Sequence, residues 1–284
     1  MEKLLIIDGN NLLFQMFYGM PSKIYNKSGQ TIHATIGFVS AILRLYKMVE
    51  ATKIVVVFDC DGSEERKEAY DDYKANRIIN WDELPSDEVP FNEEEKIKKC
   101  LESMGIKYLD SKDMEADDLI ASLVYLFKEK NKIYISSYDS DFYQLIDKNV
   151  SIIRYKGKNS KIIDEDEFVK MFSFTPNKYV FYKSLLGDNS DNIKGIELIG
   201  KKRATMIVER CVDYDDLIGK ADELFPSKVA NNIKESKAKF VLNKSIISLT
   251  HKLVVNYDIR EFMFNKDILS LTNSQILSIN GVFD

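Results

Sequence analysis

Short runs of apolar residues alternate along the first 165 residues with longer segments whose apolar residues recur every three or four positions. The runs at residues 3–7, 54–58 and 133–135 predict buried strands, because almost all of their side chains are apolar. The segments 12–18 and 36–49 predict helices, since their apolar residues fall on one helical face. Strands alternating with helices are typical of an α/β fold with a mainly parallel sheet.

The pattern changes after residue 165, where helical segments joined by short loops replace the alternation. We expect only one further strand there, at residues 252–256. We therefore predict two domains, an α/β core at residues 1–170 and a mainly helical domain at residues 171–284.

Acidic residues follow the predicted strands where each strand ends. Asp8 and Asp59 come directly after the first two runs, and Asp139 follows the third. Because the carboxyl ends of parallel strands share one edge of a sheet, we expect these side chains to meet. Crowded carboxylates repel one another unless a cation lies between them, so this edge predicts a site for hard divalent metals. The acidic residues that flank Asp139 and open the preceding helix are Glu115, Asp117, Asp118 and Asp141.

Composition excludes several other chemistries. His33 and His251 are the only histidines, and no G-x-S-x-G sequence occurs, which disfavours a histidine zinc site and a Ser-His-Asp hydrolase. The three cysteines are far apart, as expected for reduced thiols. No apolar run approaches the length of a membrane span, and the first residues do not resemble a signal peptide, so we expect a cytoplasmic protein.

The net charge of −5 argues at first against a nucleic-acid partner. However, nine carboxylates belong to the expected metal site once Asp188 and Asp191 are included. Without those nine, 36 acidic residues face 40 basic ones, and the remaining surface can carry a basic face. Asp188 and Asp191 lie three residues apart, which predicts that they share one side of a helical turn.

The segment 195–202 reads G-x-x-x-x-G-K-K and nearly matches a phosphate-binding P-loop. Lys202 stands where a P-loop needs Ser or Thr, so we favour a helix-hairpin-helix. In that interpretation Gly195 and Gly200 allow a tight turn and Ile196 and Ile199 pack beneath it. Lys201 then begins a helix whose free amides bind phosphate without regard to base sequence.

Taken together, the motifs DGNN, VVFD, YKANR, EADD, DSD, GDNSDN and GIELIGKK resemble those of the 5′-3′ exonuclease and flap endonuclease family. The resemblance covers about residues 3–255. It implies a PIN-like nuclease core with a mainly parallel sheet, a helical arch at about residues 74–104, and a helical C-terminal domain. It also implies that the C-terminal domain carries a helix-three-turn-helix, the family's helix-hairpin-helix, at about residues 187–210.

The resemblance also implies roles for single residues. Lys74 and Arg77 would act on the scissile phosphate, and Tyr73 would stack on a base. The first metal site would comprise Asp8, Asp59, Glu115 and Asp117. The second site and its water-mediated shell would comprise Asp118, Asp139, Asp141, Asp188 and Asp191. The DNA-binding set would comprise Tyr73, Lys194, Gly195, Ile196, Gly200, Lys201, Lys202 and Arg203.

The family's cofactors and substrates follow as expectations. We expect two Mg²⁺ or Mn²⁺ ions, K⁺ at the helix-hairpin-helix, and a monomer that hydrolyses DNA at 5′ flaps, nicks or free 5′ ends, including RNA–DNA primers. These activities would serve replication primer removal and repair. Two alternatives stay open, namely a binder of branched DNA without catalysis and a metal-dependent phosphatase with Asp8 as nucleophile. Residues 77–95 contain seven acids and one base, so we expect the second domain rather than the arch to hold the duplex by charge.

Overall fold

The computed structural model describes residues 1–59, 70, 72–75, 79–112, 114–249, 255–267 and 271–284. Its centre is a six-stranded sheet in the order β3-β2-β1-β4-β5-β6. The first five of these strands pair in parallel, and β6 pairs antiparallel with β5 at the edge. The strands are β1 (Glu2–Asp8), β2 (Lys53–Asp59), β3 (Lys107–Ser111), β4 (Asn131–Ser136), β5 (Val150–Arg154) and β6 (Lys161–Ile163).

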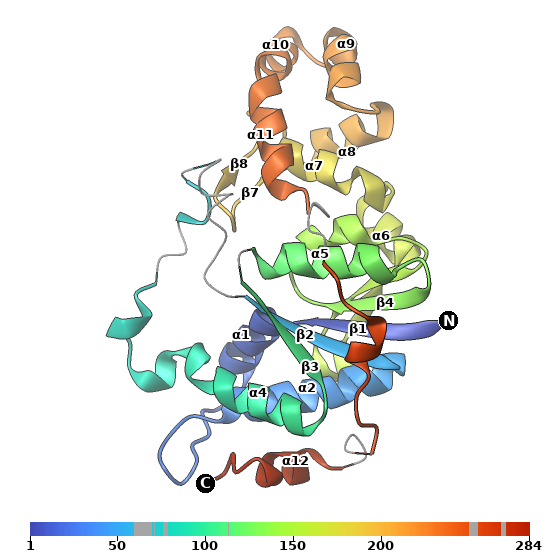
Figure 1. Ribbon diagram of the computed structural model, residues 1–284. Helices are drawn as coiled ribbons and strands as arrows, with labels where there is room; N and C mark the ends of the chain where they lie inside the picture. The colour runs from blue at the N-terminus through green and yellow to red at the C-terminus, as the bar shows by residue number, and fades with distance from the viewer. Residues whose placement is uncertain (60–69, 71, 76–78, 113, 250–254, 268–270) are drawn as a thin grey trace.

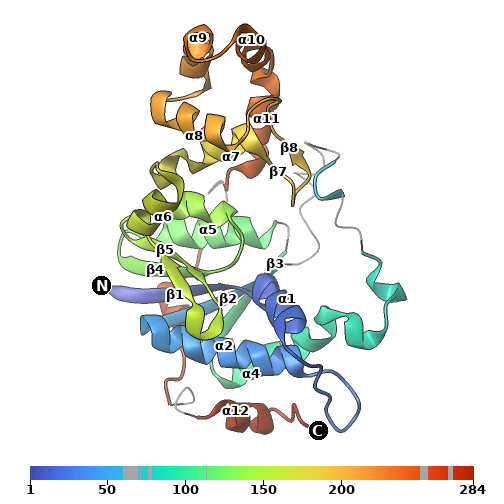
Figure 2. The same cartoon turned by 180° about the vertical axis from the view of Figure 1, so that it is seen from behind.

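Helices cover both faces of this sheet (Figures 1 and 2). Leu5 and Ile7 of β1 face a core formed with four helices, while Leu4 and Ile6 face a second core on the opposite side. This alternation follows from the two-residue period of a strand. The helices of the first core are α1 (Gly9–Gly19), α2 (His33–Val49), α4 (Glu94–Ser103) and α12 (Asn273–Ile279). Helix α5 (Ala116–Phe127) covers the other face, so the predicted α/β class is confirmed.

The chain leaves β1 toward β2 on one side and returns to β4 on the other. Such a reversal opens a crevice at the carboxyl ends of the two central strands. The antiparallel strand β6 was not predicted, because three residues are too few for a readable periodicity.

Helices dominate after residue 164, as predicted, and most of those before residue 248 lie above α5 in Figure 1, whereas α12 packs against α2. The helices before residue 248 are α6 (Glu165–Phe172), α7 (Tyr179–Leu186), α8 (Lys201–Arg210), α9 (Tyr214–Leu224), α10 (Ser227–Glu235) and α11 (Lys237–Ile247). Single 3₁₀ turns join several elements, namely η5 (Asp141–Leu145), η6 (Gly157–Asn159), η7 (Pro176–Lys178) and η8 (Ile259–Phe262). Of the strand expected at 252–256, residues 252–254 lie outside the described residues, and Val255 and Asn256 belong to no strand.

The helical turn expected around Asp188 and Asp191 is wrong. The chain there forms a small antiparallel ribbon of β7 (Gly187–Asp188) and β8 (Ile193–Lys194). Glycine is required on both sides of this ribbon. Gly187 has a φ of +73°, and a Cβ on Gly195 would lie 2.1 Å from the carbonyl oxygen of Leu186.

The described part of the predicted arch is a chain of 3₁₀ turns that leads into α4 and extends away from the sheet (Figure 1, teal). The turns are η2 (Trp81–Glu83), η3 (Ser86–Glu88) and η4 (Pro90–Glu93). Trp81 and Phe91 pack edge to face with centroids 5.4 Å apart, and both rings contact Phe14 of α1. These aromatic contacts tie the segment to the core.

Glu93 anchors the same segment, although it belongs to the acidic run of the arch. Its side chain is fully buried and accepts hydrogen bonds from the backbone N–H of Thr35 at 2.7 Å and from the Thr35 hydroxyl at 2.8 Å. Thr35 lies in the first turn of α2, so Glu93 caps that helix from a distant part of the chain. His33 lies against the other carboxylate oxygen at 3.4 Å.

Replacing Glu93 with alanine is therefore expected to destabilise the fold by about 3 kcal/mol, because it leaves the buried Thr35 N–H without its partner. Glu95→Ala, on the exposed side of α4, is the matched control and is expected to change stability by less than about 0.5 kcal/mol. Urea unfolding of both variants measures the difference. Equal stabilities would show that the cap contributes nothing.

Candidate metal centre

A cavity of about 420 Å³ opens at the carboxyl edge of the sheet, where the reversal of strand order places it. Its lining combines acidic residues from three strand ends with residues from α1, α5 and the arch. The lining residues are Asp8, Asn10, Asn11, Phe14, Asp59, Lys74, Phe91, Glu115, Ala116, Asp117 and Asp139.

Asp8 is held at the end of β1 by two hydrogen bonds. Its carboxylate caps α1 by accepting from the N–H of Asn11 at 3.1 Å, and it accepts from the hydroxyl of Ser137 at 2.7 Å. Burial raises the pKa of Asp8 to about 7, and the nearby carboxylates of Asp139 and Asp59 add to the rise. The position is therefore costly for a lone carboxylate and favourable for one that shares a cation.

Asp59 and Glu115 meet across the ends of β2 and α5. One oxygen of Asp59 accepts from the Ser111 hydroxyl and from the N–H of Ala116, both at 3.1 Å. Burial raises the pKa of Asp59, and the charge of Glu115 adds to the effect. Glu115 is itself buried and stands at the N-terminus of α5.

Asp117 and Asp139 complete the acidic lining. Burial raises the pKa of Asp117 well above its usual value, and the charges of Asp139 and Asp8 act in the same direction. Asp139 is oriented by the turn after β4, since one of its oxygens accepts from the N–H of Asp141 at 2.7 Å. That bond connects the cavity to a second acidic group.

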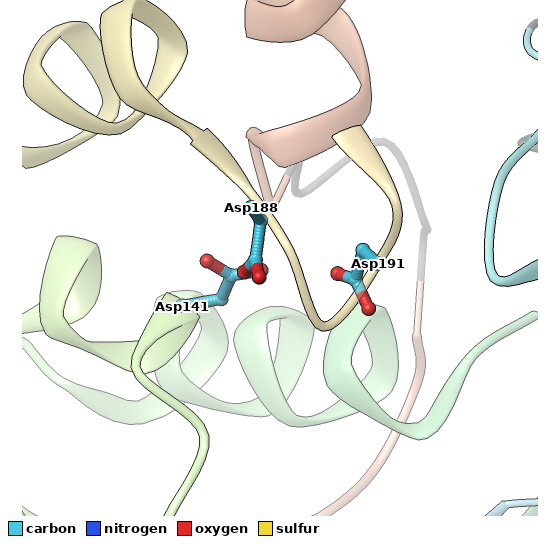
Figure 3. A group of neighbouring side chains, drawn as sticks. All are labelled: Asp141, Asp188 and Asp191. Carbon is cyan, nitrogen blue, oxygen red and sulfur yellow. The ribbon is translucent and has the colours of Figure 1, made fainter. Parts of the chain in front are cut away.

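The second group consists of Asp141, Asp188 and Asp191, and each offers an oxygen within 4.8 Å of the others. Asp141 begins η5, whereas Asp188 and Asp191 come from the β7–β8 ribbon, as Figure 3 shows. Residues almost fifty positions apart thus converge because the ribbon folds down onto the end of the sheet. We call these three residues the ribbon cluster.

A buried lysine stands against the ribbon cluster. Lys183 of α7 forms ion pairs with Asp141 and with Asp188, the latter at 2.5 Å. Burial opposes the charged form of Lys183, but the charge of Asp141 and its acidic neighbours raise the pKa of the ammonium. Burial likewise opposes the charged form of Asp188, but the ion pair with Lys183 lowers the pKa of that carboxyl to about 2.

The structure brings together most of the acidic residues expected from the sequence. Asp8, Asp59, Glu115 and Asp117 line the cavity as one group. Asp139 lines that cavity too, although it was assigned to the second site. Among the described residues, Asp118 belongs to neither the cavity lining nor the ribbon cluster.

Lys74 also lines the cavity. Its ammonium contacts Glu115 at 3.0 Å, and its backbone N–H donates to the carbonyl of Asp191 at 3.1 Å. Burial opposes the charge, yet Glu115, Asp117 and Asp191 raise the pKa of Lys74. Tyr73 donates to Glu115 at 3.1 Å and is only 5% exposed, so in this structure its ring is not available to a base. Arg77 lies outside the described residues.

Sequence reasoning missed several residues of the site. Asn10 accepts from the N–H of Asp59, and Asn11 accepts from that of Tyr138, so both fix the strand ends that carry the acids. The DGNN motif could have indicated them, since paired amides after a strand supply such bonds. Phe14 gave no signal beyond helical periodicity. Lys183 lies in an otherwise largely apolar helix, and no sequence pattern indicated which residues it would pair with.

The hairpin after the ribbon has the predicted form. Ile196 and Ile199 are buried beneath the turn, and Lys201 begins α8 after Gly200. Lys194, Lys201, Lys202 and Arg203 are exposed on this side. Arg203 also donates to the carbonyl of Leu198 at 2.6 Å and closes the turn.

The donor set fits hard divalent metals. Every acidic ligand candidate offers carboxylate oxygen, the donor that Mg²⁺ and Mn²⁺ prefer, and histidine and cysteine are absent from the lining residues described. Each acidic group also holds one lysine ammonium, Lys74 in the cavity and Lys183 at the ribbon cluster, in the place where a cation is needed.

The helices that the structure describes include none with the length and apolar character of a membrane span.

Comparison with known proteins agrees with this architecture. Residues 3–173 match the model of the 5′-3′ exonuclease N-terminal resolvase-like domain, and residues 174–268 match that of the 5′-3′ exonuclease C-terminal SAM fold. The 5′-3′ exonuclease of Mycoplasmopsis pulmonis is 30% identical over 89% of this chain and 82% of its own length. The DNA polymerase I of Caldicellulosiruptor bescii is also 30% identical over 91% of the chain, which spans only 30% of that protein.

Solved structures show the same fold. The bacteriophage T5 flap endonuclease in a complex with DNA and metal ions superimposes with a TM-score of 0.72 at 24% identity, covering 99% of this chain and 100% of that one. The catalytic core of Rad2 in complex with DNA substrate gives a TM-score of 0.61 at 16% identity, covering 98% and 92%.

Proposed function

The chain belongs to the 5′-3′ exonuclease family, and we propose that it is a structure-specific 5′ nuclease that hydrolyses phosphodiesters of flapped, nicked or 5′-ended DNA. The observation that carries the proposal is the convergence of eight carboxylates and Lys74 at one edge of the sheet. Such a set is unfavourable on its own, because crowded, buried carboxylates cost stability unless cations lie among them.

The proposed roles follow from position. Asp8, Asp59, Glu115 and Asp117 hold one divalent ion, while Asp141, Asp188 and Asp191 hold a second, with Asp139 between the two groups. Divalent ions at such a site supply Lewis-acid stabilisation and an activated water for hydrolysis. Among the described residues lining the cavity, no serine, cysteine or histidine is available as a nucleophile, which favours direct attack by water.

Lys74 is the residue that the chain itself offers to the reacting phosphate. Its ammonium is largely buried and lies within the cavity, so a phosphate entering there meets a charge that water screens weakly. We propose that it stabilises the negative charge that builds up on the phosphate oxygens as the bond to the leaving group breaks.

We propose that the hairpin binds the duplex DNA. The start of α8 presents free backbone amides together with Lys201, Lys202 and Arg203, all exposed. We propose Mg²⁺ or Mn²⁺ as the catalytic ions and K⁺ at the hairpin. We also propose monomeric action on flaps, nicks and RNA–DNA primers during replication and repair.

The test incubates wild-type protein with a 5′-labelled flap, a nicked duplex or a phosphate monoester, each in Mg²⁺ and in EDTA. A 5′-labelled flap and a nicked duplex are expected to be cut near the junction in Mg²⁺ and to remain intact in EDTA. Tight binding without cleavage would instead identify a non-catalytic binder. Release of inorganic phosphate from a monoester, without strand cleavage, would identify a phosphatase.

Removing two hairpin charges is expected to weaken binding to every duplex sequence alike. The double variant Lys201→Ala, Lys202→Ala should flatten the slope of log affinity against log salt by about one for each phosphate that the protein no longer neutralises. The matched control is Lys96→Ala, Lys99→Ala, which removes the same charge from α4. Fluorescence anisotropy at several salt concentrations measures both slopes. If the hairpin variant kept the wild-type affinity and slope, the duplex would bind elsewhere.

A further inference from the structure

Lys183 occupies a position that the proposed mechanism does not use. Its ammonium forms ion pairs with Asp141 and Asp188, two of the three members of the ribbon cluster. The side chain is 7% exposed, so water screens these contacts only weakly. Ser140 adds a weaker contact from its hydroxyl at 3.5 Å.

The lysine holds the ribbon cluster together from a third element. Asp141 comes from the end of the sheet and Asp188 from the β7–β8 ribbon, while Lys183 projects from α7 (Figure 3 shows the acidic side chains). Without a positive charge among them, the three carboxylates would repel one another at this spacing and in a largely buried place. The ammonium therefore provides the attraction that assembles the group.

The same oxygens cannot serve two cations equally well. A divalent ion needs carboxylate oxygens at about 2.0–2.6 Å, and an ammonium approaches the same oxygens to about 2.7–2.9 Å. Two cations that share Asp141 and Asp188 at these separations would repel each other strongly, since the site is buried. An ion that binds the cluster therefore either meets the repulsion of the ammonium or displaces it from a carboxylate.

We propose that Lys183 is an internal counter-ion that competes with the divalent ion at the ribbon cluster, keeping the cluster assembled when no ion is bound and weakening ion binding there. The inference rests on the proposed second metal site. It makes Lys183 a positioning residue that sets the ion affinity of that site rather than a group that acts on the substrate.

The test measures Mn²⁺ binding and thermal stability without DNA at pH 8, comparing wild type with Lys183→Met. The variant keeps the length of the side chain and removes its charge. Its weaker Mn²⁺ site is expected to tighten by about tenfold or more, because a competing charge at close range is gone. Its metal-free Tm should fall below that of wild type, and its Tm should rise more on adding Mn²⁺. Calorimetric titration and thermal unfolding give the two readouts.

The matched control is Lys128→Met, which removes a partly buried lysine that pairs with Asp147, outside the ribbon cluster. It should leave Mn²⁺ affinity unchanged. Adding Asp188→Asn to Lys183→Met should abolish the tightened site and so place it at the cluster. If the methionine variant does not fold without metal, Lys183→Gln, which keeps a donor but no charge, replaces it in the same titration.

A lysine with only a structural role predicts the opposite sign, with Mn²⁺ affinity lowered along with Tm. Unchanged or weaker Mn²⁺ binding in Lys183→Met would thus overturn the inference while leaving Mg²⁺-dependent cleavage by wild type as evidence for the nuclease. Absence of a second Mn²⁺ site in wild type and in every variant would overturn the metal assignment and this inference together.

Discussion

Replacing Asp139 or Asp188 with alanine is expected to abolish cleavage while leaving affinity for a flap substrate within a few-fold of wild type. In the proposed function the acids hold ions, whereas the hairpin and its basic residues hold duplex. Loss of a bound ion removes several kcal/mol of transition-state stabilisation, so a rate reduction of about a thousandfold or more should follow. Any change in affinity should be toward tighter binding, because a negative charge near the phosphate backbone is removed.

The control for this comparison is Asp147→Ala, which removes a carboxylate that pairs with Lys128 and belongs to neither the cavity lining nor the ribbon cluster. It should cut at the wild-type rate. Single-turnover cleavage and anisotropy separate rate from affinity. Cleavage by the Asp139 or Asp188 variant at the wild-type rate would refute the assignment of these residues.

Replacing Lys74 with alanine is expected to lower the chemical rate far more than the affinity. A single charge that acts mainly in the transition state is worth on the order of 3 kcal/mol, or about a hundredfold in rate. The buried contact with Glu115 supports this, because it holds the ammonium inside the cavity rather than in solvent. Affinity should change little, since the proposed function assigns most of the electrostatic attraction to the hairpin.

Single-turnover cleavage with saturating enzyme isolates this effect from binding. Lys99→Ala, an exposed lysine of α4, serves as the control for loss of one charge and should cleave at the wild-type rate. An unchanged single-turnover rate in Lys74→Ala would place Lys74 away from the scissile phosphate.

Much of the site could be predicted from the sequence because strands impose a simple geometry. Asp8 and Asp59 directly follow apolar runs, and parallel pairing brings the ends of those runs to one edge. The family motifs identified the same residues and implied two domains. The family itself is confirmed by the matched family models.

Other features depend on contacts that no local pattern encodes. A spacing of three residues fits a helical turn as well as a tight ribbon. The spacing of Asp188 and Asp191 therefore could not distinguish the two structures. Glu93 stands in an acidic run, and nothing in that run indicates that the distant N-terminus of α2 packs against it. Lys183 lies in α7, and its partners Asp141 and Asp188 come from two other elements.

The dependence of rate on metal concentration tests the central claim most directly. Saturating wild-type protein is mixed with a 5′-labelled flap over a range of Mg²⁺ concentrations, and the single-turnover rate is measured at each. Two ions required for one cleavage predict a log–log slope approaching about two at low Mg²⁺ and no product in EDTA. A slope of about one, or cleavage that persists in EDTA, would contradict catalysis by two divalent ions at this edge of the sheet.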